Sequence, residues 1–174
     1  MTESAVSENL VCFAHGKESG PWGLKITRLA DVARRCGFDV ISPDYSHTQD
    51  PQVRIAQLRG LEPCARRLVL VGSSMGGYVS AMACAQLKPR ALFLMAPALY
   101  FPFPGWDAEP EGIPPLCSVV HGWHDDIVPV ERSLRFAQKH RAELHLLDAE
   151  HTLNARVDTI ARLFEDFLQR VLAS

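Results

Sequence analysis

Short apolar runs recur along the chain, separated by longer segments of mixed polarity. Several runs, such as Leu68–Val71 and Ala91–Met95, are apolar at every position. Parallel strands that are covered on both faces show this continuous pattern, and their alternation with helix-like segments is typical of an α/β protein. We therefore predict one open, mainly parallel sheet of six strands. The predicted strands are Leu10–Ala14, Phe38–Ile41, Leu68–Val71, Ala91–Met95, Leu116–Val120 and Leu144–Leu147.

The segments between these runs carry the spacing of amphipathic helices. Apolar residues recur at helical intervals over residues 26–33, and Gly37 follows them as a candidate C-terminal cap. The clearest apolar stripe belongs to the last helix and extends from Val157 to Val171. Asp50-Pro51 and Val128-Pro129 each place a proline where a helix can begin. We expect such helices on both faces of the sheet.

One connection departs from this alternation. Between the fourth and fifth runs the chain reads PALYFPFPGWDAEPEGIPP over residues 97–115. Its prolines disfavour a helix, and it is longer than most connections in a compact domain. It carries four aromatic side chains, Tyr100, Phe101, Phe103 and Trp106. Because exposing them all to water would be costly, we expect the segment to fold back over another part of the protein.

The composition fits one ordinary folded domain. The 174 residues are 47% hydrophobic and 22% charged, which is enough for one sizeable core. No Gly/Ser-rich or charged linker divides the chain, so we predict a single domain over residues 1–174. Lys and Arg together number 18 against 20 Asp and Glu. Because nucleic-acid binding needs a continuous basic surface, this balance argues against a nucleic-acid partner.

Targeting and cysteine patterns complete this picture. The N-terminal stretch MTESAVSENL has neither the basic nor the apolar region of a secretory leader, and no apolar run approaches the length of a membrane span. We therefore expect a cytoplasmic protein without a membrane span. The five cysteines are widely spaced and form no C-x-x-C pair, which favours reduced thiols over disulfides or a zinc site.

The strongest local signal is a glycine-flanked serine. Residues 72–76 read Gly-Ser-Ser-Met-Gly, the pattern G-x-S-x-G, directly after a predicted strand and before a helix predicted from Met75 to Leu87. Strand, sharp turn and helix are the context of a nucleophile elbow. The glycines permit close backbone approach, and the helix start favours a developing negative charge. Ser74 is therefore the predicted nucleophile, while Ser73 lacks the flanking glycines.

A serine nucleophile needs a base, and the base needs an orienting acid. The chain reads HGWHDDIVP over residues 121–129, after the fifth predicted strand, and DAEHTL over residues 148–153, after the sixth. Open α/β sheets place their sites at the carboxyl ends of their strands. Of the seven histidines, only His151 lies between the last strand and the last helix, and we predict it as the base. Asp125 and Asp126 both remain open as the acid.

Together these segments resemble the α/β-hydrolase superfamily, whose triad follows the chain order Ser, Asp, His. The resemblance covers nearly the whole chain. The family's pattern of His-Gly, two residues, Asp and then Val-Pro implies Asp125 as the acid. The early His15-Gly16 resembles the family's oxyanion loop. This likeness implies an oxyanion hole made by the backbone N–H groups of Met75 and Lys17.

The chain departs from the usual family pattern in three ways. There is no room for the two N-terminal antiparallel strands before the first predicted strand, and there is no large lid insertion. The segment after His15-Gly16 reads Lys-Glu-Ser-Gly instead of a run of glycines. The chain therefore resembles the compact, lidless variety of the superfamily.

The resemblance implies a serine hydrolase that cleaves a carboxylic ester or thioester through an acyl-Ser74 intermediate. It implies a small acyl substrate and neither a metal ion nor an organic cofactor. We expect the aromatic residues in connections near the site to line an acyl pocket. They are Trp22, Trp123 and the loop Tyr100–Trp106, with Tyr100, Phe101 and Phe103 as its substrate-contacting members.

Other interpretations remain open at this point. The same triad also serves enzymes that act on an amide or a C–C bond, or that transfer an acyl group to an acceptor other than water. A small-ligand-binding protein without turnover is the alternative outside enzymes. A dinucleotide-binding domain is disfavoured, because no G-x-G-x-x-G follows the first apolar run. The oligomeric state is left open.

Overall fold

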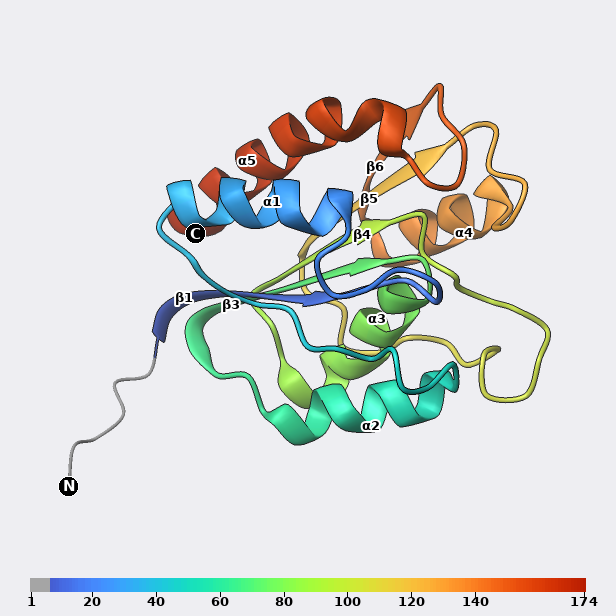
Figure 1. The fold of residues 1–174 in the computed structure, drawn as a ribbon, viewed down its shortest axis with the longest axis horizontal. Helices are drawn as coiled ribbons and strands as arrows, with labels where there is room; N and C mark the ends of the chain where they lie inside the picture. Colours follow the sequence, from blue (N-terminus) through green and yellow to red (C-terminus); the bar gives the residue numbers. More distant parts are fainter. Residues whose placement is uncertain (1–6) are drawn as a thin grey trace.

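A sheet of six strands crosses the centre of the molecule in the order β2-β1-β3-β4-β5-β6 (Figure 1). The computed structural model describes residues 7–174; residues 1–6, part of the stretch from which we predicted no leader, lie outside this range. All five pairings between the described strands are parallel. The strands are β1 (Ser7–Ala14), β2 (Asp39–Ile41), β3 (Ala65–Ser73), β4 (Ala91–Met95), β5 (Leu116–Gly122) and β6 (Glu143–Leu147). The six predicted strands are confirmed.

Helices cover both faces of the sheet, as predicted. They are α1 (Leu24–Arg35), α2 (Pro51–Leu61), α3 (Met75–Leu87), α4 (Val130–His140) and α5 (Val157–Ala173), with a short 3₁₀ turn η1 (Asn154–Arg156) before α5. Helices α1 and α5 lie on one face, and α2, α3 and α4 on the other (Figure 1). Asp50 caps α2 by accepting a hydrogen bond from the Gln52 N–H at 2.8 Å. Gly37 follows α1 with φ +83°, a left-handed conformation that suits glycine.

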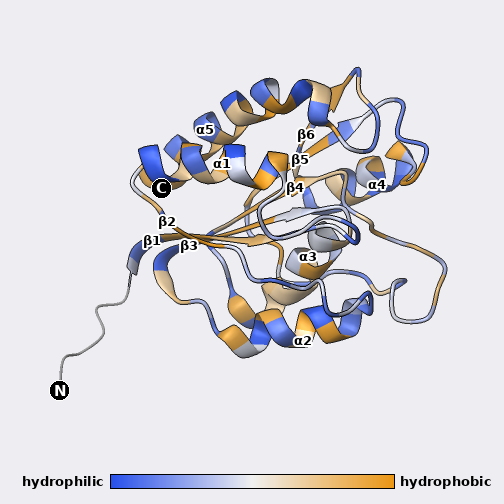
Figure 2. Ribbon diagram, in the orientation of Figure 1, coloured by the Kyte–Doolittle hydropathy of each residue, from blue (hydrophilic) through white to orange (hydrophobic). Residues whose placement is uncertain are grey.

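The apolar strands separate two hydrophobic cores. Val69 and Val71 of β3 pack in the core beneath α1 and α5, whereas Leu68 and Leu70 pack in the core beneath α2, α3 and α4. Figure 2 shows the hydrophobic colour concentrated on the strands and on the helix surfaces that face them. The continuous apolar runs therefore reflect burial on both faces of the sheet.

The strand order brings two loops together at one edge of the sheet. From β1 the chain first moves outward to β2 and then returns to the other side of β1 to form β3. Open α/β sheets bind ligands at such a reversal, outside the carboxyl ends of the strands. The segments that follow β1 and β3 therefore lie side by side, and they contain His15-Gly16 and Ser74.

The helices and the cysteines of residues 7–174 bear on the membrane span and the disulfides considered above. None of its helices is both long and apolar enough to cross a membrane. All five cysteines are free thiols, and Cys12, Cys84 and Cys117 are buried.

Candidate active site

Ser74 occupies a sharp turn between β3 and α3. Its backbone angles are φ 54° and ψ −117°, a conformation that costs residues with a side chain on the order of 1–3 kcal/mol. Hydrogen bonds hold it there. The Ser74 N–H donates to the Met95 carbonyl at 2.9 Å, and the Ser74 carbonyl accepts from the N–H groups of Gly77 and Ala98, both at 2.9 Å.

Three glycines make this turn sterically feasible. A Cβ at Gly76 would lie 1.9 Å from the Ala14 carbonyl oxygen, and a Cβ at Gly72 would lie 2.2 Å from the Gly76 carbonyl oxygen. A Cβ at Gly77 would lie 2.8 Å from the Cβ of Pro97. These distances are far below van der Waals contact. The elbow therefore needs glycine at all three positions because other backbone segments approach so closely.

His151 lies in the loop after β6 and faces Ser74. Its Nε2 lies 3.0 Å from Ser74 Oγ, and its Nδ1 lies 2.7 Å from Asp125 Oδ2. A carboxylate only accepts hydrogen bonds, so Nδ1 carries the proton and Nε2 accepts from the Ser74 hydroxyl. Close packing brings this loop to the site, since a Cβ at Gly122 would lie 2.2 Å from the Ala149 carbonyl oxygen.

The Asp125 side chain is fully buried after β5. Its Oδ1 accepts from the N–H groups of Ile127 (2.9 Å) and Val128 (2.7 Å), and its Oδ2 lies 3.0 Å from His121 Nε2 as well as beside His151. Burial by itself raises the pKa of Asp125. The interactions with His121, His151 and the Val128 N–H outweigh burial and hold the pKa of this carboxyl well below its usual range.

The structure thus brings together the three side chains that the sequence singles out. Ser74, His151 and Asp125 form one chain of hydrogen bonds. The two neighbouring alternatives are not part of this chain of hydrogen bonds. Asp126 is exposed, and Ser73, the last residue of β3, is buried.

Lys17 and Met75, the predicted oxyanion donors, border the cavity that contains Ser74. Met75 is the first residue of α3, where a backbone N–H has no partner within the helix and lies at the positive end of the helix dipole. Within residues 7–174, neither the Lys17 N–H nor the Met75 N–H donates a hydrogen bond to a protein acceptor. Both groups are therefore free to bind a ligand oxygen.

Arg54 of α2 holds the loop after β1, although no sequence signal indicated this residue. It is only 1% exposed. Its Nη1 donates to the carbonyl oxygens of His15 (3.2 Å) and Gly16 (3.1 Å), and its Nε donates to that of Thr48 (2.9 Å). Burial lowers the pKa of Arg54, but a guanidinium remains protonated in proteins. These charge-assisted hydrogen bonds fix the backbone next to Lys17.

His15 stiffens the same loop. Its Nε2 accepts a hydrogen bond from the Tyr45 N–H at 2.9 Å, so its Nδ1 carries the proton and donates to the Gly16 carbonyl at 2.8 Å. Burial lowers the pKa of His15 and favours this neutral form. Both ring nitrogens are therefore used, and the ring joins the loop after β1 to the segment after β2.

A cavity of about 860 Å³ opens at this edge of the sheet and contains Ser74 and His151. Three aromatic side chains of the segment 97–115 line it: Phe101, Phe103 and Trp106. Phe101 contacts both others, with ring centroids 6.3 Å from Phe103 and 5.6 Å from Trp106. One wall of the cavity is thus aromatic, and Phe101 and Phe103 lie where the sequence placed them.

The other three predicted pocket residues lie outside the cavity lining. Trp22 and Trp123 are surface residues, 49% and 54% exposed. Tyr100 turns towards α4, and its hydroxyl donates to Glu109 Oε1 at 2.9 Å. All three belong to connections near the correct edge of the sheet. Their side chains point elsewhere, and a sequence pattern does not report side-chain direction.

The segment 97–115 folds back over the protein, as expected. Trp106 stacks on the ring of Tyr78 in α3, with centroids 5.6 Å apart. Glu109 accepts hydrogen bonds from Tyr100 and, at 3.0 Å, from His140 Nε2 at the end of α4. The segment is therefore attached to α3 and α4, and these contacts support the aromatic wall.

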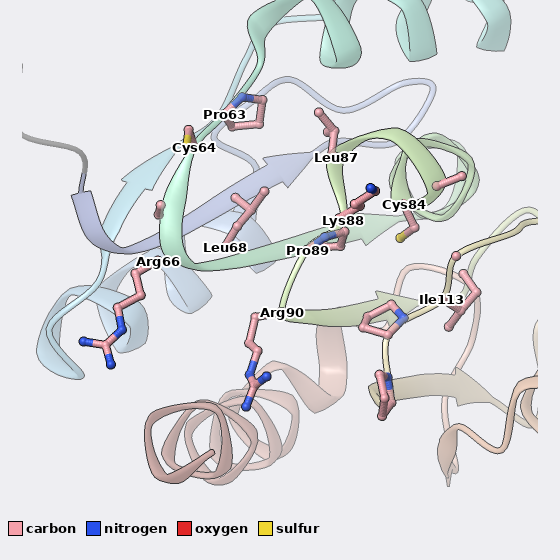
Figure 3. A pocket seen from close by; sticks show the side chains of 15 residues that line it. Pro63, Cys64, Arg66, Leu68, Cys84, Leu87, Lys88, Pro89, Arg90 and Ile113 are labelled. Carbon is pink, nitrogen blue, oxygen red and sulfur yellow. The ribbon is translucent and has the colours of Figure 1, made fainter.

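A second cavity, of about 540 Å³, lies at the amino ends of the strands, away from Ser74. In Figure 3, Arg66 and Arg90 point away from its apolar side chains Cys84 and Ile113. Among the described residues, its lining includes no serine, histidine or carboxylate. No three His, Cys, Asp or Glu side chains gather as metal ligands anywhere in residues 7–174.

The chain is similar to one protein family and to several solved structures. Residues 10–109 match the model of the "Uncharacterised protein family (UPF0227)". No curated protein sequence matches the chain at a significant level. A crystal structure from Xanthomonas campestris pv. campestris, assigned to the hydrolases of the alpha/beta superfamily, is 37% identical. That match covers 94% of this chain and 99% of the other, with a TM-score of 0.83.

Two more distant solved structures share the fold. Est1E from Butyrivibrio proteoclasticus is 17% identical over 99% of this chain and 92% of its own, with a TM-score of 0.82. A lidless a/b serine hydrolase from Xanthomonas campestris is 21% identical over 97% of this chain and 85% of its own, with a TM-score of 0.66. At these identities the likeness extends to the fold alone.

Proposed function

This chain belongs to the α/β-hydrolase superfamily and to the Uncharacterised protein family (UPF0227), and we propose that it is a serine hydrolase of carboxylic esters or thioesters. The observation that carries the proposal is the chain of hydrogen bonds from Ser74 through His151 to Asp125, at 3.0 and 2.7 Å. Nucleophile, base and orienting acid are within direct reach of one another, as this chemistry requires.

Each member of this triad has one role. His151 Nε2 takes the proton of the Ser74 hydroxyl while Oγ attacks the substrate carbonyl carbon. His151 then gives that proton to the leaving alcohol or thiol, which leaves an acyl-Ser74 ester. In the second half, His151 takes a proton from water, the resulting hydroxide attacks the acyl carbon, and Ser74 recovers its proton. The buried Asp125 carboxylate keeps the ring oriented and stabilises its charged form.

The oxyanion of each tetrahedral intermediate binds the N–H groups of Met75 and Lys17. Two observations support this assignment: both residues border the cavity beside Ser74, and both N–H groups lack a protein acceptor among the described residues. Donors that are already in place stabilise the charge without further rearrangement, which is often the largest catalytic contribution.

The acyl group occupies the space beside the aromatic wall. The cavity of about 860 Å³ suits a small or medium acyl chain. Phe101 and Phe103 give it an apolar side, and the Arg132 guanidinium lies 4.2 Å from the Phe101 ring centroid and helps to hold that ring.

Labelling with a fluorophosphonate probe tests the nucleophile without knowledge of the natural substrate. We expect the wild-type protein to be labelled and peptide mass mapping to locate the label on Ser74. Ser74→Ala should not react, and His151→Ala should react much more slowly, because the hydroxyl loses its base. Folded wild-type protein that failed to react would contradict the proposal and favour a ligand-binding function on the same scaffold.

Shortening the aromatic wall should change substrate binding more than chemistry. We expect Phe101→Ala to raise KM for 4-nitrophenyl butyrate by about tenfold with kcat nearly unchanged, because an apolar contact with the acyl chain is lost. Steady-state kinetics on this ester measure both values. Trp123→Ala is the matched control, since it removes an aromatic side chain that lies outside the cavity. Equal KM values in the two variants would mean that Phe101 does not contact the acyl chain.

A further inference from the structure

A second histidine, His121, contacts the acid of the proposed triad at the same carboxylate oxygen as His151. It lies in β5 and is fully buried. Its Nε2 lies 2.9 Å from the Val128 carbonyl oxygen and 3.0 Å from Asp125 Oδ2, and its Nδ1 lies 2.7 Å from Ser133 Oγ in α4. The ring itself is not part of the cavity lining, so it has no direct access to substrate.

The protonation of this ring follows from its partners. A backbone carbonyl can only accept, so Nε2 must carry the proton, which it donates to Val128 while it lies 3.0 Å from Asp125 Oδ2. Nδ1 then accepts from the Ser133 hydroxyl. The result is a continuous series of contacts that converges on Asp125: one arm runs from Ser133 through His121, and the other runs from Ser74 through His151.

Two imidazole rings therefore lie against Asp125 Oδ2: His151 Nδ1 donates to it, and His121 Nε2 lies 3.0 Å away, while Oδ1 accepts from two backbone N–H groups. Removing the His121 donor would leave one buried oxygen with His151 as its only partner. More of the negative charge would then act on His151, and the carboxylate would lose one of the contacts that fix its orientation.

We propose that His121 is a positioning residue for the reaction: with Ser133 behind it, its Nε2–H orients Asp125 and moderates the charge that Asp125 presents to His151. This inference rests on the proposed function and deepens it at the same site. The atoms that react with substrate remain those of Ser74 and His151.

The expected pH effect has a definite sign. Among residues 7–174, the titratable groups that contact Asp125 are His121 from β5 and His151 from the loop after β6. Ser133 of α4, which contacts His121, is uncharged. Near His151, the Lys25 ammonium of α1 is bound to the Thr152 carbonyl. Without the His121 donor, Asp125 stabilises the protonated, inactive form of His151 more strongly. Activity should then appear only at higher pH.

The test compares the kcat/KM–pH profile of wild type with His121→Leu and His121→Gln on 4-nitrophenyl acetate. For His121→Leu we expect a loss of kcat on the order of 10- to 100-fold and an acidic limb moved up by about one pH unit, the effect of one hydrogen bond to a charged group. The glutamine amide can donate from the position of Nε2. His121→Gln should therefore restore most of kcat and return the limb towards its wild-type position.

A control and a milder variant keep the test decisive. His145→Leu removes a histidine of β6 whose ring pairs with Glu143 at 3.1 Å, away from Asp125, and should leave the limb in place. If His121→Leu does not fold, Ser133→Ala serves instead. It weakens the His121 donor and should move the limb in the same direction by a smaller amount.

Two outcomes would overturn the inference. One is an acidic limb that does not move in His121→Leu, or in Ser133→Ala if the leucine variant does not fold. The other is an equal loss of kcat in the leucine and glutamine variants with an unmoved limb, which would mean that His121 only supports packing. Fluorophosphonate labelling separates this failure from failure of the proposed function. Wild-type labelling at Ser74 with an unmoved limb refutes only the role of His121.

Discussion

Ser74→Ala should lose about 10⁶-fold in kcat on 4-nitrophenyl acetate, because removing the nucleophile of a serine triad removes nearly all of its catalytic power. The remaining rate would come from the oxyanion donors and from binding alone. The fold should survive, since the substitution removes one oxygen whose side-chain partner is His151. The strained backbone at φ 54° depends on the main-chain hydrogen bonds of Ser74, which alanine keeps.

The adjacent serine provides the matched control for this measurement. Ser73→Ala removes the same atom one residue earlier in β3 and should keep turnover far above that of Ser74→Ala. Thermal unfolding of both variants should resemble that of wild type. If Ser74→Ala kept wild-type turnover while folded, the acyl-enzyme mechanism would be wrong.

Arg54→Lys should lower kcat by about 10²-fold while KM changes little, because one donor of the oxyanion hole moves out of position. Arg54 reaches the carbonyl oxygens of His15, Gly16 and Thr48 at the same time. A lysine ammonium has no planar fork and cannot repeat this geometry. The backbone at Lys17 should then lose its fixed orientation, and transition-state binding should weaken more than substrate binding.

Arg59→Lys is the matched control for Arg54→Lys. Arg59 also lies in α2 and also donates to a backbone carbonyl, that of Met82, but it does not contact the loop after β1. We expect its kcat to match wild type. Thermal unfolding of both variants shows whether lost activity merely follows lost stability. Unchanged kcat in folded Arg54→Lys would mean that the loop keeps its shape without the guanidinium.

The fold was predictable because burial on both faces leaves a continuous apolar run for each strand. The ends of strands were harder to place. β3 begins at Ala65, before its apolar part, although Arg66 and Arg67 are polar. Pairing extends the strand, since Ser7 and Asn9 of β1 lie opposite Ala65 and Arg67. Backbone hydrogen bonds to a neighbouring strand set that length, and they leave no trace in hydropathy.

The positions of the three residues in the proposed triad were predictable for a similar reason. Glycines around Ser74 mark a turn that side chains would obstruct, and His151 and Asp125 follow strands whose carboxyl ends share one edge of the sheet. The choice between Asp125 and Asp126 required the family pattern. In the structure the two carboxyl groups differ completely, because one is buried beside three hydrogen-bond donors and the His121 ring, and the other is exposed.

Local sequence patterns are enough to predict the order of the strands along the chain, the elbow at Ser74 and the two strand ends that carry Asp125 and His151. The strand order within the sheet and the partners of Arg54 and His121 can be read only from the packed structure. The same holds for the aromatic side chains that line the cavity. The physical reason is that these contacts depend on the direction of each side chain after distant segments have packed together. Local spacing determines the direction of a side chain relative to its own helix or strand, but not what another segment places opposite it.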